Sequence, residues 1–115
     1  MLRGEIWWVD FYPGRGREAD KLRPAVIVSN DRANAAAVRL GRGVITVVPV
    51  TSNVRRIYPF QVLLSAKATA LAVDSKAQAE QIRSVAAERL GQRIGRIGPA
   101  ELAQLDNALR LHLQL

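Results

Sequence analysis

Hydrophobic segments bounded by glycine, proline and small polar residues run through the first half of the chain and predict β-strands. Residues 4–11 (Gly-Glu-Ile-Trp-Trp-Val-Asp-Phe) are the first segment, and residues 44–50 and 60–64 are two more. Residues 26–28 are all β-branched, which favours a pleated and buried strand. The pattern predicts a protein built mainly of short strands.

Alanine weakens the pattern in the second half. Residues 68–73 and 77–84 are interpreted as further strands, and residues 86–90 as a helical turn ended by Gly91. Residues 93–97 predict a last short strand.

Two helical segments complete the prediction. A capping residue followed by alanines predicts a short helical turn or an ordered loop over residues 29–38. Gly98 and Pro99 predict the start of a closing helix, because proline is favoured in the first helical turn. Its apolar stripe is Leu102, Leu105, Leu109 and Leu113. We therefore expect an α+β, mainly β fold: one small, strongly bent barrel or sheet with helices packed outside, in a single domain over residues 1–115.

The charge is strongly positive. The chain has 17 Lys and Arg residues against 10 Asp and Glu, a formal net charge of +7, and arginine greatly outnumbers lysine. Two segments, residues 31–56 and 75–98, carry most of the excess. This favours an anionic partner: nucleic acid, an acidic protein segment or a membrane surface. The alternative is that the charge only solvates an exposed face.

Several chemistries are excluded by composition. Without cysteine there is no disulfide, thiolate zinc site or cysteine nucleophile, and a single histidine, His112, excludes multi-histidine metal sites and histidine-pair ribonuclease chemistry. We expect no metal and no cofactor. No signal peptide or apolar run of about 18 residues is present, so we expect a cytoplasmic protein that does not enter a membrane.

Arg23 is the first candidate functional residue. Pro24 follows it and fixes the chain as it enters the β-branched strand, so the guanidinium lies in a defined pose at a strand edge. A fixed guanidinium contacts phosphate through two parallel hydrogen bonds. The alternative is a strand-flanking charge in a solvated loop. Thr51 and Ser52 follow the strand at 44–50, where rigid backbone positions side chains, although turn chemistry explains them equally well.

Arginine, glutamate and hydroxyl groups on a basic surface suit RNA cleavage. An RNA strand carries its own nucleophile, the 2′-hydroxyl, so a protein needs only to align it, assist proton transfer and stabilise the charge on the phosphoryl oxygens.

The sequence resembles the MazF/PemK family of toxin endoribonucleases. The residues that carry the resemblance are 4–11, Glu18, Arg-Pro-Ala-Val-Ile-Val-Ser-Asn at 23–30, Val-Pro-Val-Thr-Ser at 48–52, Tyr-Pro-Phe at 58–60 and Glu-Gln-Ile-Arg-Ser at 80–84. They occur in the family's order and cover nearly the whole chain.

The resemblance implies an SH3-like barrel with a C-terminal helix, a homodimer, and metal-independent cleavage of single-stranded RNA at short sequences. It implies that Arg23 stabilises the transition state and donates a proton to the leaving 5′-oxygen, and that Thr51 orients the phosphate. Glu18 matches an acidic position implicated in proton transfer or RNA contact. The expected products are a 2′,3′-cyclic phosphate and a 5′-hydroxyl end.

Further RNA contacts are expected around this centre. Ser52 is a helper of, or substitute for, Thr51, and four arginines flank the same two loops: Arg15, Arg17, Arg55 and Arg56. The resemblance and the +7 charge together predict a cognate acidic antitoxin that covers the basic groove.

Two rival interpretations remain at the sequence level. A gyrase-directed toxin on the same fold uses a tryptophan-glycine-isoleucine end, whereas this chain ends in His-Leu-Gln-Leu. A catalytically silent barrel that binds RNA or peptide predicts binding without strand cleavage.

Overall fold

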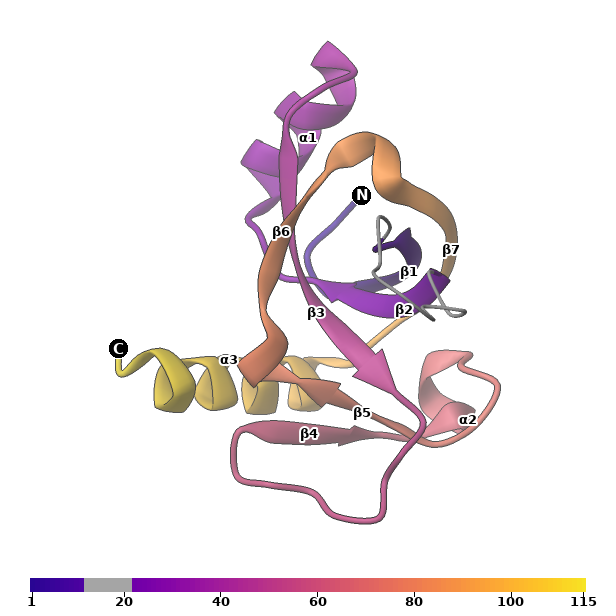
Figure 1. The fold of residues 1–115 in the computed structure, drawn as a ribbon, viewed down its shortest axis with the longest axis vertical. Coiled ribbons are helices and arrows are strands. Elements are labelled where there is room, and N and C mark those ends of the chain that lie inside the picture. Colours follow the sequence, from indigo (N-terminus) through magenta and orange to yellow (C-terminus); the bar gives the residue numbers. More distant parts are fainter. Residues whose placement is uncertain (12–21) are drawn as a thin grey trace, which may run out of the picture.

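The computed structural model describes residues 1–11 and 22–115. In this part of the chain seven strands form one antiparallel sheet, ordered β4-β5-β3-β2-β1-β7, with β6 paired to the first half of β3. The strands are β1 (Glu5–Asp10), β2 (Leu22–Ile27), β3 (Val44–Thr51), β4 (Gln61–Leu64), β5 (Ser75–Gln78), β6 (Arg83–Ala86) and β7 (Leu90–Arg96). In Figure 1 the sheet curls strongly, with the β4–β5 pair at the bottom and β1, β2 and β7 curving around one end.

Helix α1 (Asp31–Leu40) connects β2 to β3 and lies at the opposite end of the molecule from β4 and β5 (Figure 1). The Asn30 side chain caps it by accepting a hydrogen bond from the Ala33 N–H at 2.8 Å. Gly41 ends it with φ 68°, a left-handed conformation that glycine adopts without a Cβ clash. The helix predicted at 29–38 is therefore present and longer than a turn.

Helix α3 (Pro99–Leu113) begins at the predicted glycine and proline and packs beside β4. Leu105 and Leu109 are buried in the core, while Leu102 is partly buried against it. The fourth leucine of the predicted apolar stripe, Leu113, is 45% exposed and does not join the core. His112 is exposed near the end of this helix.

The core has two hydrophobic clusters. The larger contains Leu105 and Leu109 of α3 with residues from five strands, and the smaller lies among β1, β2, β3 and α1. Residues on opposite faces of β1 enter different clusters: Ile6 belongs to the larger cluster and Val9 to the smaller one. Both faces of β1 therefore meet protein. No helix in the described ranges is long and apolar enough to span a membrane.

Two predictions for the alanine-rich region are wrong. Residues 68–73 do not form a strand. The first two of them belong to helix α2 (Ala66–Thr69), and residues 70–73 form the loop that follows it. Residues 77–84 are not one strand, because the 3-10 turn η1 (Ala79–Gln81) separates β5 from β6. Alanine favours helix and is depleted in strands, so its local preference agrees with α2 and is overridden by strand pairing in β5.

The following segment also differs in part from the prediction. A 3-10 turn, η2 (Ala87–Arg89), lies where a helical turn is predicted, but β7 begins at Leu90 and contains Gly91. The glycine that matters for packing is Gly95, where a Cβ atom would collide with the carbonyl oxygen of Thr69. This close approach places α2 against β7.

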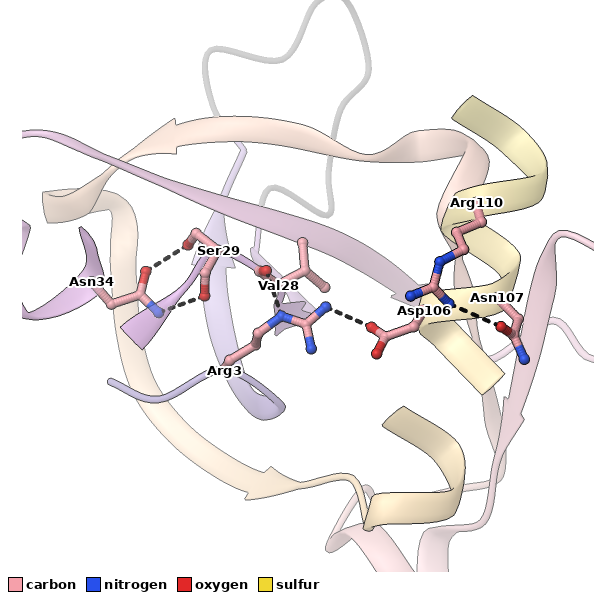
Figure 2. Close-up of polar contacts among 7 residues, drawn as sticks. All are labelled: Arg3, Val28, Ser29, Asn34, Asp106, Asn107 and Arg110. Atoms are coloured by element: carbon pink, nitrogen blue, oxygen red, sulfur yellow. Dashed lines mark hydrogen bonds and ion pairs between the residues drawn. The ribbon is translucent and has the colours of Figure 1, made fainter. Parts of the chain in front are cut away.

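Arg3 connects the N-terminal segment to helix α3 and to the residue that follows β2 (Figure 2). Its Nη2 contacts Asp106 Oδ1 of α3 at 2.6 Å, and its Nε donates to the Val28 carbonyl at 2.8 Å. Nearby, the buried side chain of Asn34 donates to the Ser29 carbonyl at 2.9 Å and holds α1 against the end of β2. These contacts satisfy polar groups where three segments meet.

Candidate functional site

The candidate site lies where β2 and β3 separate. The pairing of β2 with β3 ends at Ala25 and Pro49, whereas β2 continues its pairing with β1 as far as Leu22. Pro24 has no N–H to donate, which suits a strand that loses a neighbour at this point. Beyond Pro49, β3 leaves β2 and pairs with β5 through Val50 and Thr51. The two strands therefore open into a gap that Arg23 faces.

Arg23 bridges this gap with neutral partners. Its Nη2 donates to the Val50 carbonyl at 3.3 Å and to Gln78 Oε1 of β5 at 3.0 Å. Within the described ranges no carboxylate lies at salt-bridge distance from its guanidinium. The side chain is half-buried and fixed on one edge, and its charge is uncompensated by these neighbours. Such a group is suited to an anion in the gap.

Thr51 is the last residue of β3 and lies beside Arg23. Arg23 donates to the carbonyl of Val50, the residue before Thr51, and both Arg23 and Thr51 face the same groove. The Thr51 hydroxyl oxygen accepts a hydrogen bond from the Asn53 N–H at 3.2 Å. This turn orients the hydroxyl and leaves its hydrogen free to be donated to a ligand.

Arg23, Thr51 and Ser52 line one groove of about 810 Å³. Its apolar wall includes Trp8, which is 40% exposed, and residues of the segment after α2 and of β7, namely Leu71, Val73 and Ile94. Polar groups at one side of an open, partly apolar groove are typical of a ligand site. In the described residues, no group of three or more His, Asp or Glu side chains is arranged to hold a metal ion.

The remaining predicted residues fall into two groups. Arg55 and Arg56 are exposed in residues 52–60, the loop between β3 and β4, and they do not line the groove. The Arg55 N–H donates to Asn53 Oδ1 at 3.2 Å, and Arg56 Nη1 donates to Tyr58 Oη at 3.2 Å. Arg15, Arg17 and Glu18 lie outside the described residues.

Sequence reasoning missed two residues of this region. Gln78 accepts a hydrogen bond from Arg23. The sequence predicts residues 77–84 only as one weak strand. The pairing of β5 with β3 and β4 is what shows which way Gln78 faces. Arg93 lines the groove from β7 and forms an ion pair with Glu5 at 3.2 Å. The charge excess over residues 75–98 was the available signal for Arg93.

Glu5 is held in its charged form beside the groove. Burial alone raises the pKa of its carboxyl group, but hydrogen bonds from Trp7 Nε1 and the Leu2 N–H, both at 3.0 Å, and the charge of Arg93 outweigh it. The net effect is a pKa below the ordinary value of 4.5. Arg93 therefore faces a carboxylate near neutral pH, unlike Arg23.

The family of the chain follows from a profile match. The profile described as PemK-like, MazF-like toxin of type II toxin-antitoxin system matches residues 2–113. The chain belongs to this family. The groove formed by Arg23, Thr51 and Ser52 is thus found on a PemK-like, MazF-like toxin chain, and the predicted family resemblance is confirmed.

Individual relatives agree with the family assignment. Endoribonuclease MazF9 of Mycobacterium tuberculosis is 72% identical over 115 residues, which cover 100% of this chain and 98% of that protein. Among solved structures, MazF from Deinococcus radiodurans superposes with a TM-score of 0.79 at 27% identity, over 100% of this chain and 97% of that chain. A mycobacterial endoribonuclease in complex with its cognate antitoxin gives 0.75 at 25% identity, covering 100% and 96%.

The structural likeness confirms the predicted fold class. The mainly antiparallel sheet with a C-terminal helix is the fold of the MazF structures, and in the described residues the sheet is strongly curved without closing.

Proposed function

We propose that this PemK-like, MazF-like chain acts as a single-domain toxin that cleaves single-stranded RNA at short sequences. The observation that carries the proposal is the placement of Arg23, held by neutral acceptors, beside the oriented hydroxyl of Thr51 in one groove. Its closely similar relative is named an endoribonuclease.

The proposed reaction needs little from the protein beyond alignment and charge. The 2′-hydroxyl oxygen attacks the adjacent phosphorus, the bond from phosphorus to the 5′-oxygen breaks, and the products are a 2′,3′-cyclic phosphate and a 5′-hydroxyl end. Thr51 donates to a phosphoryl oxygen and Ser52 assists it. Arg23 stabilises the added negative charge on the phosphoryl oxygens and donates the proton to the leaving 5′-oxygen.

Glu18 is the proposed acceptor of the 2′-hydroxyl proton, on the strength of the resemblance alone. Arg15, Arg17, Arg55 and Arg56 are proposed to contact the RNA backbone, which sets position and affinity. The arginine and hydroxyl groups supply charge stabilisation directly, so the proposed cleavage is metal-independent.

The partners are proposed in the same way. A similar mycobacterial endoribonuclease has been solved with its cognate antitoxin. We infer that a flexible acidic antitoxin covers the groove of this chain, that the toxin is a homodimer, and that it acts in the cytoplasm. Charge complementarity to a +7 protein supports the acidic partner.

The test is cleavage of a long mixed-sequence RNA in the presence of a chelator, with mapping of the new ends. The wild-type protein is expected to cut at a recurring short sequence and leave 5′-hydroxyl ends. Arg23→Ala and the double variant Thr51→Val/Ser52→Ala are expected to abolish cleavage, and the double variant is needed because the two hydroxyls are adjacent. Arg32→Ala, which removes an exposed arginine of α1, is the control. Binding of intact, uncut RNA by the wild type would favour the silent RNA-binding barrel instead.

A further inference from the structure

The loop of residues 52–60 ends in two aromatic side chains arranged as a stack. The rings of Tyr58 and Phe60 are nearly parallel, with 3° between their planes and 5.3 Å between their centroids. Pro59 lies between them and restricts the backbone. Tyr58 is 41% exposed, whereas a tyrosine used only for packing is normally covered. An exposed ring therefore stands on a supporting ring.

Two cations flank the Tyr58 ring. The guanidinium carbon of Arg56 lies 5.4 Å from the ring centroid and Lys76 Nζ lies 5.8 Å from it. In the described part of the chain neither cation has a carboxylate at salt-bridge distance. An aromatic face beside uncompensated positive charge suits a base joined to a phosphate.

The loop is held in place from below by Lys76. Only 8% of Lys76 is exposed, and its Nζ donates to the Arg56 carbonyl at 2.7 Å. The Tyr58 N–H donates to Gln61 Oε1 at 3.1 Å, and Gln61 Nε2 donates to Glu80 Oε2 at 2.8 Å. The backbone on both sides of the ring is thus fixed to β4, β5 and the turn that follows β5.

Lys76 also links this stack to the groove. In the register of β3 and β5 it is the direct partner of Thr51. Residues directly opposite each other in an antiparallel pair project on the same face of the sheet. Lys76 is therefore a neighbour both of Thr51, across the two strands, and of the Tyr58 ring, whose centroid lies 5.8 Å from Lys76 Nζ.

We propose that Tyr58 is a specificity-determining residue that stacks on one base of the bound RNA, next to the phosphate at Arg23 and Thr51. This inference rests on the proposed function and adds a base contact to it. A base competes effectively with Arg56 for the ring, because an exposed cation over a ring is held weakly compared with a stacked base. Tyr58 touches no reacting atom, so it affects RNA affinity and site choice rather than the chemical step.

The test uses a short single-stranded RNA chosen for tight binding to the wild type, with the 2′-hydroxyl removed at the cleaved nucleotide where cleavage occurs. An abasic nucleotide is placed at each position in turn, and the Kd of each RNA is measured for the wild type, Tyr58→Leu and Tyr58→Phe. At one position, loss of the base should weaken wild-type binding by at least about 5-fold. Tyr58→Leu should lose that sensitivity there and nowhere else, and Tyr58→Phe should keep it.

A role limited to loop packing would weaken all the RNAs equally in Tyr58→Leu, and that result overturns the proposal. On cleavable RNA, Tyr58→Leu should raise KM with little change in kcat and relax the sequence at one position of the mapped sites. If the wild type binds RNA with the predicted base sensitivity but never cuts it, the stacking inference stands and the nuclease proposal fails. Cleavage without that sensitivity leaves the nuclease and removes the stack.

Discussion

Two arginines in different regions of this molecule are held in opposite ways. Arg3, where the N-terminal segment meets α3, is bound to the Asp106 carboxylate at 2.6 Å and to the Val28 carbonyl at 2.8 Å (Figure 2). Arg23, where β2 leaves β3, is bound to the Val50 carbonyl and the Gln78 amide. Both are half-buried and both join separate segments, but of the two, Arg3 alone has a carboxylate partner within the residues that the structure describes.

The difference separates an arginine that serves the fold from one suited to a ligand. A carboxylate partner neutralises the guanidinium, so the guanidinium gains less from contact with a bound anion. Neutral acceptors orient the guanidinium without removing its charge, so the attraction for a phosphate remains. Hydrogen-bond partners therefore distinguish these two arginines, whereas burial does not.

The largest expected effect is on cleavage by Arg23→Gln. Loss of a preorganised charged donor to the phosphoryl oxygens should lower kcat/KM by about 100- to 1,000-fold. The free energy of unfolding should change by less than about 1 kcal/mol, because the lost bonds are two half-exposed contacts to neutral groups. Cleavage assays and urea unfolding measure the two quantities. A large loss of stability would mean that Arg23, like Arg3, mainly serves the fold.

Arg3→Gln should show the reverse pattern. It leaves the Val28 carbonyl and Asp106 without their guanidinium partner and should lower the free energy of unfolding by about 2 kcal/mol, a charged hydrogen bond discounted for exposure. Cleavage per folded molecule should stay unchanged. Arg110→Gln is the matched control. Arg110 is exposed on α3, the helix that contains Asp106, and within the described residues its side chain donates to the neutral Asn107 Oδ1 at 3.1 Å. Equal losses in both variants would show that the Asp106 contact contributes nothing special.

Much of this organisation is predictable from sequence, and the exceptions have a common cause. The strand at 44–50 and the helix beginning at Pro99 depend on local signals, and the structure confirms both. Arg23, predicted to precede its strand, is the second residue of β2. The prediction for residues 66–81 is wrong, because the local preference of alanine for helix is followed in α2 and overridden by strand pairing in β5.

The site shows the same division. Residue type and strand position suggest Arg23 and Thr51 separately, but their proximity depends on how β2 and β3 separate beyond Ala25 and Pro49. The role of Gln78 needs a third strand, since it reaches Arg23 only because β5 pairs with the end of β3. The neutrality of the Arg23 partners, on which the comparison with Arg3 rests, is therefore a property of the fold.

Gln78→Glu should convert Arg23 toward the state of Arg3. The substitution keeps the shape of the side chain and places a carboxylate where an amide oxygen now accepts the Arg23 hydrogen bond. Competition with the phosphate should lower kcat/KM by about 5- to 10-fold, roughly 1 kcal/mol, an ordinary value for a partly exposed ion pair. Gln104→Glu on α3 makes the same change in net charge outside the groove and is the control. Similar effects from both would attribute the loss to net charge alone.

Arg93 is the intermediate case, since it lines the groove like Arg23 but is paired with Glu5. The pKa of Glu5 is below the ordinary value of 4.5, so on acidification the unfolded chain takes up the proton first. The carboxylate therefore stabilises the fold above about pH 4.5, and the contribution disappears as the pH falls through the folded-state pKa. Glu5→Gln should cost less than about 1 kcal/mol near neutral pH. Urea unfolding at pH 7 and pH 3 should show the difference from wild type shrinking at the lower pH. A difference of the same size at both pH values would mean that Glu5 stabilises the fold through its shape and hydrogen bonds, and that its charge does not hold Arg93.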